Sequence, residues 1–446
     1  MPHLAEIFTS RSSLWVSLHC RDVEKTRLYI ERSKSPPLKI SLATFKYRSD
    51  ALLLVAPHIN RLSSLSVWGS ADIVPNLIRN FSNPAPLLKR LEIGLSSDST
   101  PAFLATLFNG DISSVHELLI TGVTHLPWRN VSNLKVLELY HDPWIADAPF
   151  VTELLGFIEN APLLSDITLY SLPTSCNIPS RRVVHIPHLK KLILYSPEDG
   201  STLLRHLSIP TGASLVIEFL RRGGNPSIPG CLPENFDNLN NLSDITSTSL
   251  FLGPETKHAQ FDGPSGQLYL RGTGLDGVDS HTMQDLIFRC LQKFNPSRTQ
   301  RLAVTEATSF PSPIIETLPS MNDLRTLTLI ECKNGPFLYV LNPGLRAGAV
   351  ACPNLEELIL YTTWIDRPRT SELTGMASAR AERCAKRLSL TIVSLGKTLP
   401  EEEELFTLRE YFSRLDYKVV VKLPKWDALP GDGNGDRRDR LVERVL

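Results

Sequence analysis

This sequence lacks long hydrophobic runs, an excess of charge of either sign, and paired cysteines. Lysine plus arginine and aspartate plus glutamate both number 47, so no global charge favours nucleic acid or an anionic membrane surface. No run of about 18 apolar residues occurs, which excludes an ordinary membrane-spanning helix. We therefore expect neither nucleic acid nor a membrane among the partners of this chain.

The cysteines and the N-terminus favour an intracellular protein. The seven cysteines are odd in number and scattered, and they include no CxxC pair, so neither a disulfide framework nor a zinc site is indicated. The first fifteen residues, "MPHLAEIFTSRSSLW", contain no basic region followed by an apolar core, so no signal peptide is predicted. We expect the protein to be cytoplasmic or nuclear.

The sequence is rich in one leucine-spaced phrase. In "SNLKVLELY" (132–140), Leu134, Leu137 and Leu139 form an LxxLxL pattern. The last two leucines are separated by one residue, which places both side chains on one face of a short strand. Similar phrases occur at 86–94, 162–170, 187–195, 321–329 and 353–361, and degenerate copies occur at Leu62–Leu65–Val67 and Val115–Leu118–Ile120.

The spacing between these phrases predicts the architecture. From Leu62, successive first positions lie 26, 27, 19, 30 and 25 residues apart, and Leu324 precedes Leu355 by 31 residues. Leucine-rich repeats typically run about 20–29 residues, with a strand followed by a helix or 3₁₀ turn. The intervening segments 102–110 and 150–160 are predicted helices, each preceded by a proline. We therefore predict an α/β fold: an irregular leucine-rich-repeat solenoid, a right-handed superhelix of strand–helix units with a C-terminal cap.

Four parts of the chain are predicted. They are a strand–helix–strand N-terminal element over 1–45, the leucine-rich-repeat solenoid over 46–400, a helix–strand cap over 401–425, and a mobile polar tail over 426–446. Within the later parts, we expect a strand at 265–272, helices at 280–294, near 370–387 and at 405–415, and a strand at 417–423.

The residues between the apolar positions are predicted to point outward and to form a protein-binding face. Four tyrosines immediately follow strand phrases, and repetition would align them along one surface, where aromatic side chains favour protein contacts. Packing of these tyrosines into neighbouring repeats is the alternative. The candidate face consists of Lys135, Glu138, Tyr140, Tyr170, Lys190, Tyr195, Arg325, Thr328, Glu357 and Tyr361.

One glycine motif is typical of nucleotide-binding enzymes. "GTGLDG" (272–277) matches G-x-G-x-x-G between a predicted strand and a predicted helix. However, Asp276 and Asp279 would place carboxylates at the helix start, where a pyrophosphate should bind. We favour a flexible turn over a dinucleotide site.

Other motifs are equally weak. "DGNGDRRDRLVE" (432–443) resembles a calcium loop, but Arg437 occupies the position at which the sharp turn needs glycine. His185 and His188 precede a repeat strand without metal or catalytic spacing, and no GxSxG motif occurs. We therefore expect no enzyme activity, no catalytic residue, no metal and no cofactor.

Residues 13–42 carry a second pattern. "SLWVSLHCRDVEKTRLYIERSKSPPLKISL" predicts a strand, a helix capped by Asp22, and a second strand, with Val23, Leu28 and Tyr29 facing inward. This phrase resembles the segment that follows the F-box in basidiomycete F-box-like leucine-rich-repeat proteins. Residues 377–429 also resemble the closing region of that family.

The resemblance implies a function that the motifs do not. Such proteins use the F-box to dock onto a Skp-type adaptor of a cullin–RING ubiquitin ligase, and they use the repeats to hold a substrate. Only thirteen residues precede Leu14 and Trp15, so the F-box itself is largely missing and the adaptor is expected as a partner only if an upstream F-box exists. The chain is then the substrate-binding part of such a receptor, with a protein substrate of unknown identity. The alternatives are a stand-alone leucine-rich-repeat scaffold unconnected to ubiquitin and, more remotely, a nucleotide-dependent enzyme that uses the 272–277 loop.

Overall fold

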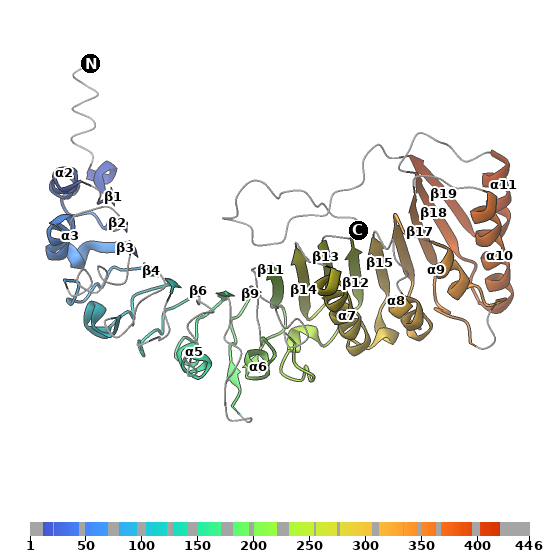
Figure 1. The fold of residues 1–446 in the computed structure, drawn as a ribbon, viewed down its shortest axis with the longest axis horizontal. Coiled ribbons are helices and arrows are strands. Elements are labelled where there is room, and N and C mark those ends of the chain that lie inside the picture. The colour runs from blue at the N-terminus through green and yellow to red at the C-terminus, as the bar shows by residue number, and fades with distance from the viewer. Residues whose placement is uncertain are drawn as a thin grey trace, which may run out of the picture. The chain divides into compact units, whose positions relative to one another are not determined.

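The chain has a mixed α/β fold that is dominated by parallel β-sheet (Figure 1). The computed structural model describes residues 12–20, 22–43, 50–69, 80–95, 104–122, 126, 128–140, 150–170, 182–195, 200–220, 232–253, 256–273, 277–305, 312–332, 334–345, 349–362, 367–394 and 402–419. The chain divides into two compact units. Unit 1 comprises Met1–Asp244 and Gly263–Leu286, and unit 2 comprises Ile245–Asp262 and Ile287–Leu446. These divisions differ from the predicted boundaries at 45, 400 and 425, which stay predictions.

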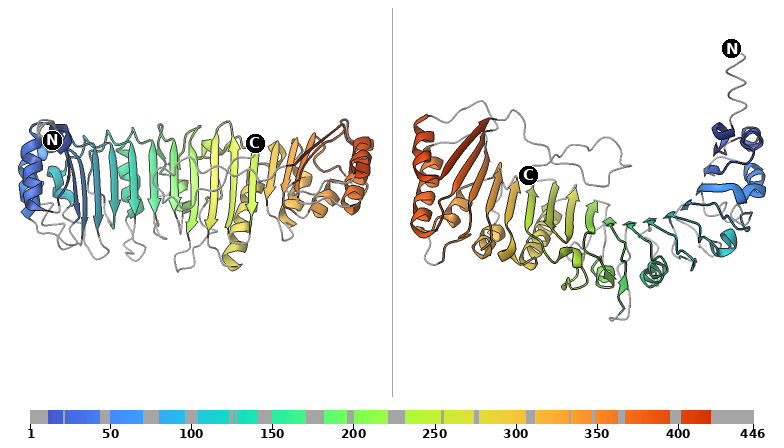
Figure 2. Two further views of the ribbon diagram at one scale, coloured as in Figure 1. Left: turned by 90° about the horizontal axis from the view of Figure 1, so that it is seen from above. Right: turned by 180° about the vertical axis from the view of Figure 1, so that it is seen from behind.

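The strands of unit 1 pair side by side in chain order, and all of these pairs are parallel (Figure 2). They are β1 (Ser17–His19), β2 (Leu38–Ala43), β3 (Leu62–Gly69), β4 (Arg90–Leu95), β5 (Glu117–Thr121), β6 (Val136–Tyr140), β7 (Asp166–Tyr170), β9 (Lys191–Tyr195), β11 (Ser214–Leu220) and β14 (Gly266–Thr273). A separate short pair joins β8 (Val184–His185) to β10 (Leu207–Ser208).

The helices of unit 1 lie on one side of its strands (Figure 1). They are α2 (Val23–Ser33), α3 (Asp50–Val55), α5 (Phe150–Glu159) and α6 (Gly200–Arg205), together with 3₁₀ segments at Ser12–Trp15, Ala56–Arg61, Leu104–Gly110 and Asn240–Leu242. Helix α5 confirms the helix predicted at 150–160. Because parallel strands need a crossover connection, these helices and turns return the chain to the same end of the sheet for each new strand.

The N-terminal strand–helix–strand prediction is confirmed by β1, α2 and β2. The Asp22 side chain accepts a hydrogen bond from the Lys25 backbone N–H at 3.0 Å, as an N-cap should. The predicted inward face was wrong for Leu28, whereas Val23 and Tyr29 are half-buried; the buried residues of the helix are Thr26, Ile30 and Ser33. Leu28 is exposed, because the stripe that meets the sheet falls at positions i, i+4 and i+7, and Leu28 lies on another side of the helix.

The helix predicted at 102–110 is wrong over its described part. Residues Leu104–Gly110 form an interrupted 3₁₀ segment, in which Phe108 and Asn109 have φ values of 53° and 57°. The Phe108 ring is fully buried and lies 6.4 Å from the ring of Phe81, centroid to centroid. Burial of this ring therefore decides the backbone conformation here and overrides the local helix pattern.

Unit 2 repeats the parallel arrangement. Its strands are β12 (Ser247–Leu252), β13 (Thr256–Gly263), β15 (Arg301–Thr305), β16 (Thr326–Ile330), β17 (Glu357–Thr362), β18 (Ser389–Ser394) and β19 (Arg414–Val419). Strand β13 is antiparallel to β12, and the series from β12 through β15 to β19 is parallel throughout. The predicted strand at 417–423 therefore begins earlier than expected, and residues 420–423 lie outside the described residues.

Helices accompany the strands of unit 2. They are α7 (Gly277–Lys293), which begins in unit 1, and α8 (Ser312–Thr317), α9 (Asn334–Leu341), α10 (Arg367–Arg383) and α11 (Glu402–Tyr411). Helices α7, α10 and α11 confirm the helices predicted at 280–294, near 370–387 and at 405–415, and β14 confirms the strand predicted at 265–272. The tail over 426–446 lies outside the described residues.

The core is built from the leucine-spaced phrases. The three pattern positions of each of the eight phrases are all buried, and the most exposed of these residues, Leu139, is only 4% exposed. Neighbouring phrases stand in direct register: Leu137 lies beside Leu118 on one side and Ile167 on the other. Each such side chain contributes roughly 1.5–3 kcal/mol by leaving water. The predicted strands are therefore confirmed at these phrases.

Candidate protein-binding face

The side of the unit 1 sheet that points away from its core carries two rows of aligned side chains. Strand register defines both, because each residue lies beside its partner on the next strand. The aromatic row consists of Trp68, Gly94, Thr121, Tyr140, Tyr170, Tyr195, Glu218 and Arg271. The central row lies two residues earlier on each strand and consists of Ser66, Glu92, Leu119, Glu138, Thr168, Ile193, Val216 and Tyr269.

Three tyrosines of the aromatic row form a stacked ladder. The rings of Tyr140 and Tyr170 lie 3.7 Å apart with an interplanar angle of 12°, and those of Tyr170 and Tyr195 lie 4.2 Å apart at 6°. Both distances are shorter than the strand spacing of about 4.8 Å, so the rings lean together above the sheet. All three side chains are half-buried, and each therefore keeps part of its surface accessible.

The hydroxyl groups of the ladder also interact. Burial raises the pKa of Tyr170 well above its usual range, and hydrogen bonding with Tyr140 and Tyr195 raises it further. Burial likewise raises the pKa of Tyr140. The ladder therefore stays uncharged at neutral pH and presents hydroxyl groups that both donate and accept hydrogen bonds.

An indole ring occupies the far end of the same row. A Cβ atom at position 94 would overlap the indole of Trp68, so the ring of Trp68 lies across Gly94 on the neighbouring strand. The indole N–H donates to Glu92 Oε1 at 2.8 Å and to Ser66 Oγ at 3.1 Å. Glycine at 94 is therefore required for the position of this ring.

Carboxylates gather beside the indole. Arg90 pairs with Glu117 at 3.0 Å and with Glu92 at 3.5 Å. Burial raises the pKa of Glu138, the like charges of Glu92 and Glu117 raise it further, and Arg90 partly offsets the shift. Three carboxylates thus face a single arginine in this group.

The other end of the aromatic row is polar. Glu218, only 8% exposed, forms an ion pair with Arg271 at 3.4 Å between Nη1 and Oε1. This pair adjoins Tyr195, because Tyr195 and Glu218 are partners in register. The row therefore runs from an indole through three phenol rings to an ion pair.

The three predicted cations lie elsewhere. Lys135, Lys190 and Arg325 are exposed, but each precedes its strand instead of lying within it. Their backbone carbonyls accept hydrogen bonds from the next strand, as Lys135 does from Ser165 and Asp166 at 2.8 and 3.0 Å. They were expected on the strand face; they mark the edge where strands begin, because the chain turns before it enters each strand.

The remaining predicted residues belong to unit 2. Thr328 lies on the outward side of β16 but is only 8% exposed, which contradicts its expected exposure. Glu357 and Tyr361 are half-buried on β17. Tyr361 lies in register between Ile330 and Val393, so the fourth tyrosine has aliphatic neighbours and not aromatic ones.

Several residues of the face were missed, although the sequence contains a signal for them. Tyr140 stands one position after the last apolar residue of its phrase. The same position in the degenerate phrases is Trp68 or Thr121, and in the phrase at 86–94 it is Gly94. Alignment of all eight phrases, rather than selection of tyrosines, would have placed these residues in one row.

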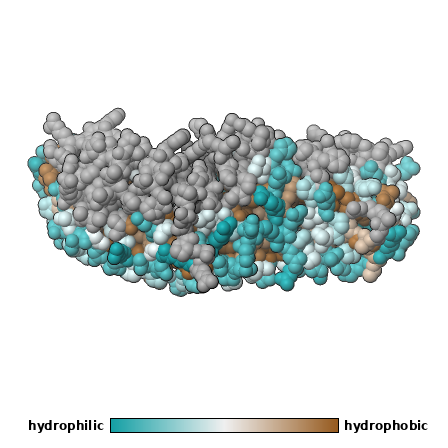
Figure 3. Space-filling model, turned by 60° about the horizontal axis from the view of Figure 1, so that its bottom comes forward, coloured by the Kyte–Doolittle hydropathy of each residue, from teal (hydrophilic) through white to brown (hydrophobic). Residues whose placement is uncertain are grey.

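The face drawn in Figure 3 has a different character. Its described surface is mainly hydrophilic, with scattered hydrophobic residues. Aligned aromatic side chains therefore make the strand face of unit 1 the better candidate for partner contact.

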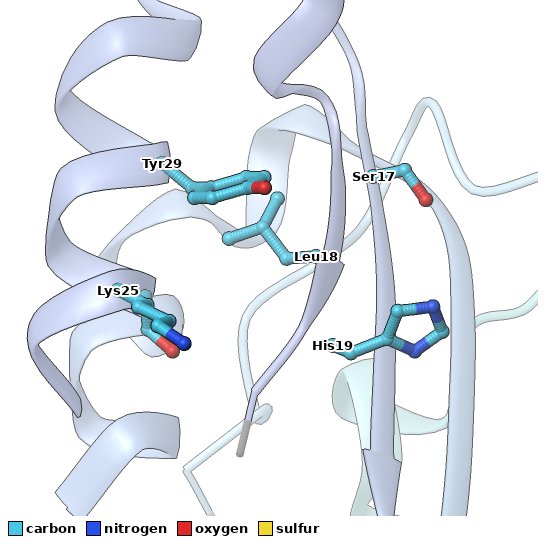
Figure 4. A pocket seen from close by; sticks show the side chains of 6 residues that line it. Ser17, Leu18, His19, Lys25 and Tyr29 are labelled. Atoms are coloured by element: carbon cyan, nitrogen blue, oxygen red, sulfur yellow. The ribbon is translucent and has the colours of Figure 1, made fainter. Parts of the chain in front are cut away.

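A small pocket lies near the N-terminal element. Its volume is ≈ 120 Å³, and it is lined by residues of β1 and α2, including His19, Lys25 and Tyr29 (Figure 4). Leu18 points toward α2, whereas Ser17 and His19 extend to the other side of β1 (Figure 4). The pocket is small and partly open, and we assign it no ligand.

The structure describes some residues of the weaker motifs, and we assign these motifs no ligand. Gly272 and Thr273 end β14, and Gly277 begins α7, as the motif over 272–277 predicted; residues 274–276 lie outside the described residues. Residues 432–443 also lie outside them. His185 and His188 are exposed. Within the part of the chain that the structure describes, no group of three or more histidine, cysteine, aspartate or glutamate side chains is arranged to hold a metal ion.

Among the described helices, none is both long enough and apolar enough to cross a bilayer. No protein-family model matches this chain, and no curated protein matches its sequence.

Proposed function

We propose that this chain is a non-enzymatic protein-recognition module, built as an irregular right-handed leucine-rich-repeat solenoid. Phrases 19 to 31 residues apart form successive parallel strands in direct register, which supports a repeat unit of strand plus connection. Such repeats expose one strand of each unit on a common face, and that face binds partners in solenoid proteins.

The observation that carries the proposal is the tyrosine ladder of Tyr140, Tyr170 and Tyr195. Stacking holds the rings in place before a partner arrives, so little side-chain freedom is lost on binding. Tyrosine combines a large apolar ring with a hydroxyl group and is enriched at the centres of protein interfaces. A preorganised row of such side chains therefore suits a protein partner.

We further propose that the module is the substrate-binding part of an F-box-type receptor for a cullin–RING ubiquitin ligase, in the cytoplasm or the nucleus. The resemblance of residues 13–42 to the segment after an F-box supports this, as does the strand–helix–strand arrangement of β1, α2 and β2. A Skp-type adaptor is then a partner of the form that contains an F-box.

The recognition face is tested by quantitative affinity purification of the tagged chain from cells of its own organism. We expect a set of proteins to be lost when Tyr140, Tyr170 and Tyr195 are all changed to serine. The matched control changes Tyr339 and Tyr411, which are 54% and 36% exposed and lie on helices, to alanine. Proteins that are retained equally by both variants would contradict a role of the ladder.

The ligase assignment needs a separate experiment. Calorimetric titration with a Skp-type adaptor is run on this chain and on a form extended by the upstream genomic reading frame. We expect only the extended form to bind. Binding by neither would contradict the ubiquitin assignment and leave a stand-alone leucine-rich-repeat scaffold.

A further inference from the structure

The residues immediately ahead of strands β4, β5, β6, β7 and β9 of unit 1 form a row of their own. Each member after the first donates its backbone N–H to the carbonyl of the previous member at 2.7 or 2.8 Å. These bonds continue the parallel sheet by one residue, so neighbouring members lie about 4.8 Å apart. The basic row consists of Lys89, His116, Lys135, Ser165 and Lys190.

The positive charge of the basic row is not neutralised within it. Lys89, Lys135 and Lys190 are exposed, and among the described residues their side chains form neither a hydrogen bond nor an ion pair. Burial lowers the pKa of His116, and the like charges of Lys89 and Lys135 lower it further. The negative charge of Glu117 offsets this pKa shift in part. Positive charge therefore outweighs negative charge around this imidazole.

Two carboxylates that adjoin the row have other partners. Glu117, the first residue of β5, forms an ion pair with Arg90 at 3.0 Å. Asp166, the first residue of β7, accepts a hydrogen bond from the Ser165 hydroxyl at 2.6 Å. Within the described part of the chain, neither carboxylate pairs with a lysine of the basic row, so these lysines stay available to an acidic ligand.

The corresponding row of unit 2 is compensated in charge. The same kind of backbone hydrogen bond defines its members, which are Thr246, Gln300, Arg325 and Glu356. Glu356 forms an ion pair with Lys386 at 2.6 Å, and Arg325 also acts on its charge. The repeat architecture therefore does not require a run of cations at this position, and the accumulation of lysine distinguishes unit 1.

The spacing of the lysines fits an extended peptide. Two strand spacings separate Lys89 from Lys135, and two more separate Lys135 from Lys190, which is about 9.6 Å in each case. A polyproline II chain has three residues per turn and rises about 3.1 Å per residue, so side chains three positions apart lie on one side at intervals of about 9.3 Å. Three acidic side chains with this separation can therefore meet the three lysines in succession.

The composition of this edge suits a peptide better than a nucleic acid. Sites for single-stranded nucleic acid combine cations with aromatic side chains on which the bases stack, and the basic row contains no aromatic residue. Leu87 and Leu163 lie two residues ahead of Lys89 and Ser165 and are 45% and 40% exposed. This apolar surface suits the proline or aliphatic side chains that separate the carboxylates of an extended peptide.

We propose that the basic row binds an extended acidic segment of a protein partner, with carboxylates three residues apart that contact Lys89, Lys135 and Lys190. The inference goes beyond the proposed function, because it assigns a second surface. The basic row precedes the strands, whereas the tyrosines of the ladder are the last residues of β6, β7 and β9. Because the lysines are exposed, their attraction for the segment should weaken as salt is added.

Fluorescence anisotropy of a labelled peptide, titrated with the full chain at low ionic strength, tests the spacing directly. The probe peptide has the order Glu-Pro-Pro-Glu-Pro-Pro-Glu, and the control peptide has the same composition with its three glutamates adjacent. We expect the spaced peptide to bind roughly threefold or more tightly than the clustered one, since it places all three carboxylates on lysines. Equal affinities, or no saturable binding of the spaced peptide at millimolar protein or peptide, would overturn the proposal.

Matched variants separate the basic row from general attraction. Lys135→Gln removes the central cation and should weaken binding of the spaced peptide roughly two- to fivefold. Arg325→Gln, at the corresponding position of unit 2, should leave it unchanged. The triple change of Lys89, Lys135 and Lys190 to glutamine should abolish the preference for the spaced peptide. Both side chains of the matched pair are exposed, and urea unfolding checks that each variant is folded. Equal losses in Lys135→Gln and Arg325→Gln contradict the assignment.

Competition with a single-stranded RNA distinguishes the other class of anionic partner. Oligouridylate should displace the spaced peptide poorly. If it binds more tightly than the peptide and depends on the same three lysines, the basic row is a nucleic-acid surface and the proposal fails.

The tyrosine-ladder variant keeps this inference separate from the proposed function. Serine at Tyr140, Tyr170 and Tyr195 should leave binding of the spaced peptide unchanged, and loss of binding in that variant would contradict a second surface. If no cellular protein depends on the ladder, the proposed function fails, whereas the anisotropy titration still decides whether the basic row binds an acidic segment.

Discussion

Unit 1 and unit 2 place the same leucine-spaced phrases on parallel strands, yet they differ in the residue that follows the last buried position. In unit 1 this residue is repeatedly aromatic and half-buried, as in Tyr140, Tyr170 and Tyr195. In unit 2 three of the equivalent residues, Thr305, Ile330 and Val393, are 3%, 1% and 4% exposed, whereas Tyr361 is half-buried. The first three side chains lie on the outward side of the sheet and are still covered.

The difference shows that alternation along a strand decides on which side of the sheet a side chain lies. It does not decide how exposed that side chain is. Both units obey the same alternation, because their buried leucines stand in register in the same way. Exposure depends on what else covers that side, and this is a property of each unit. A binding face is therefore better sought where outward side chains stay accessible, as the tyrosine ladder does.

The largest expected effect is a difference in lost stability between substitutions on the two sides of strand β9. Leu192→Ala removes a fully buried side chain of β9 and should destabilise unit 1 by about 3 kcal/mol, through lost burial and the cavity left behind. Ile193→Ala, one residue along and half-buried on the outward side, should cost roughly 1 kcal/mol or less. Urea unfolding of both variants measures the contrast. Equal losses would mean that the outward side of unit 1 is packed like its core.

A smaller effect should distinguish glycines of the two units. Gly94→Ala forces the indole of Trp68 to move and should destabilise unit 1 by about 1–3 kcal/mol, with a change in tryptophan fluorescence. The control is Gly375→Ala in α10, where an added Cβ meets nothing within 4 Å. That change should stabilise unit 2 by roughly 0.5–1 kcal/mol, because alanine favours a helix over glycine. Effects of the same sign would contradict the packing of Trp68 across Gly94.

Ring stacking should be measurable as a coupling energy in unit 1. In a double-mutant cycle, Tyr140→Ala and Tyr170→Ala should show a coupling of about 1 kcal/mol in urea unfolding. The matched pair in unit 2, Tyr361→Ala with Val393→Ala, consists of register neighbours without stacked rings and should show a smaller coupling. A larger coupling in unit 2 would mean that the ladder adds little beyond ordinary burial.

The smallest expected effects are changes in stability at pH 7 after removal of one carboxylate, and they should have opposite signs in the two units. Burial raises the pKa of Glu138 above its ordinary value of 4.5, so its ionisation destabilises unit 1 as pH rises through the folded-state pKa. Glu138→Gln should therefore be more stable than the unchanged protein at pH 7, with the difference vanishing below pH 4.5. Hydrogen bonding to Lys386 holds the pKa of Glu356 below 4.5, so that carboxylate stabilises unit 2 above this pH. Glu356→Gln should be slightly less stable at pH 7.

Urea unfolding of the two variants at pH 4 and pH 7 provides the comparison. The expected pattern is a gain for one variant and a loss for the other at the higher pH, with both differences reduced at the lower pH. The same sign for both variants at pH 7 would show that Glu138 has a compensating partner when the protein is in solution.

Most of the regular structure was predictable, for a physical reason that particular elements illustrate. The leucine phrases predict strands because burial on one side of a short strand needs apolar residues two apart, and α5, α7, α10 and α11 were predictable from helical periodicity. The helix at 102–110 was not, because burial of Phe108 overrides local propensity. The inward stripe of α2 was also missed, since its core contact includes Thr26 and Ser33, which no hydrophobic pattern marks.

The candidate face was only partly predictable. Tyr140, Tyr170 and Tyr195 were expected together and are stacked, whereas Lys135, Lys190 and Arg325 lie ahead of their strands. The offset arises because the second position of each LxxLxL pattern is still in the turn. Sequence spacing cannot distinguish that residue from one inside the strand.

The order of apolar residues along the chain was therefore enough to locate the strands and the buried side chains, because hydrophobic burial depends on local periodicity. Only the tertiary structure decided which outward residues meet. First positions of successive phrases lie 19 to 31 residues apart, so the register that brings Trp68 across Gly94 and stacks Tyr140 on Tyr170 depends on how whole strands pack. The exposure of the tyrosine ladder in unit 1 and the burial of Thr305, Ile330 and Val393 in unit 2 were decided in the same way, because coverage of a sheet depends on segments that are distant in the sequence.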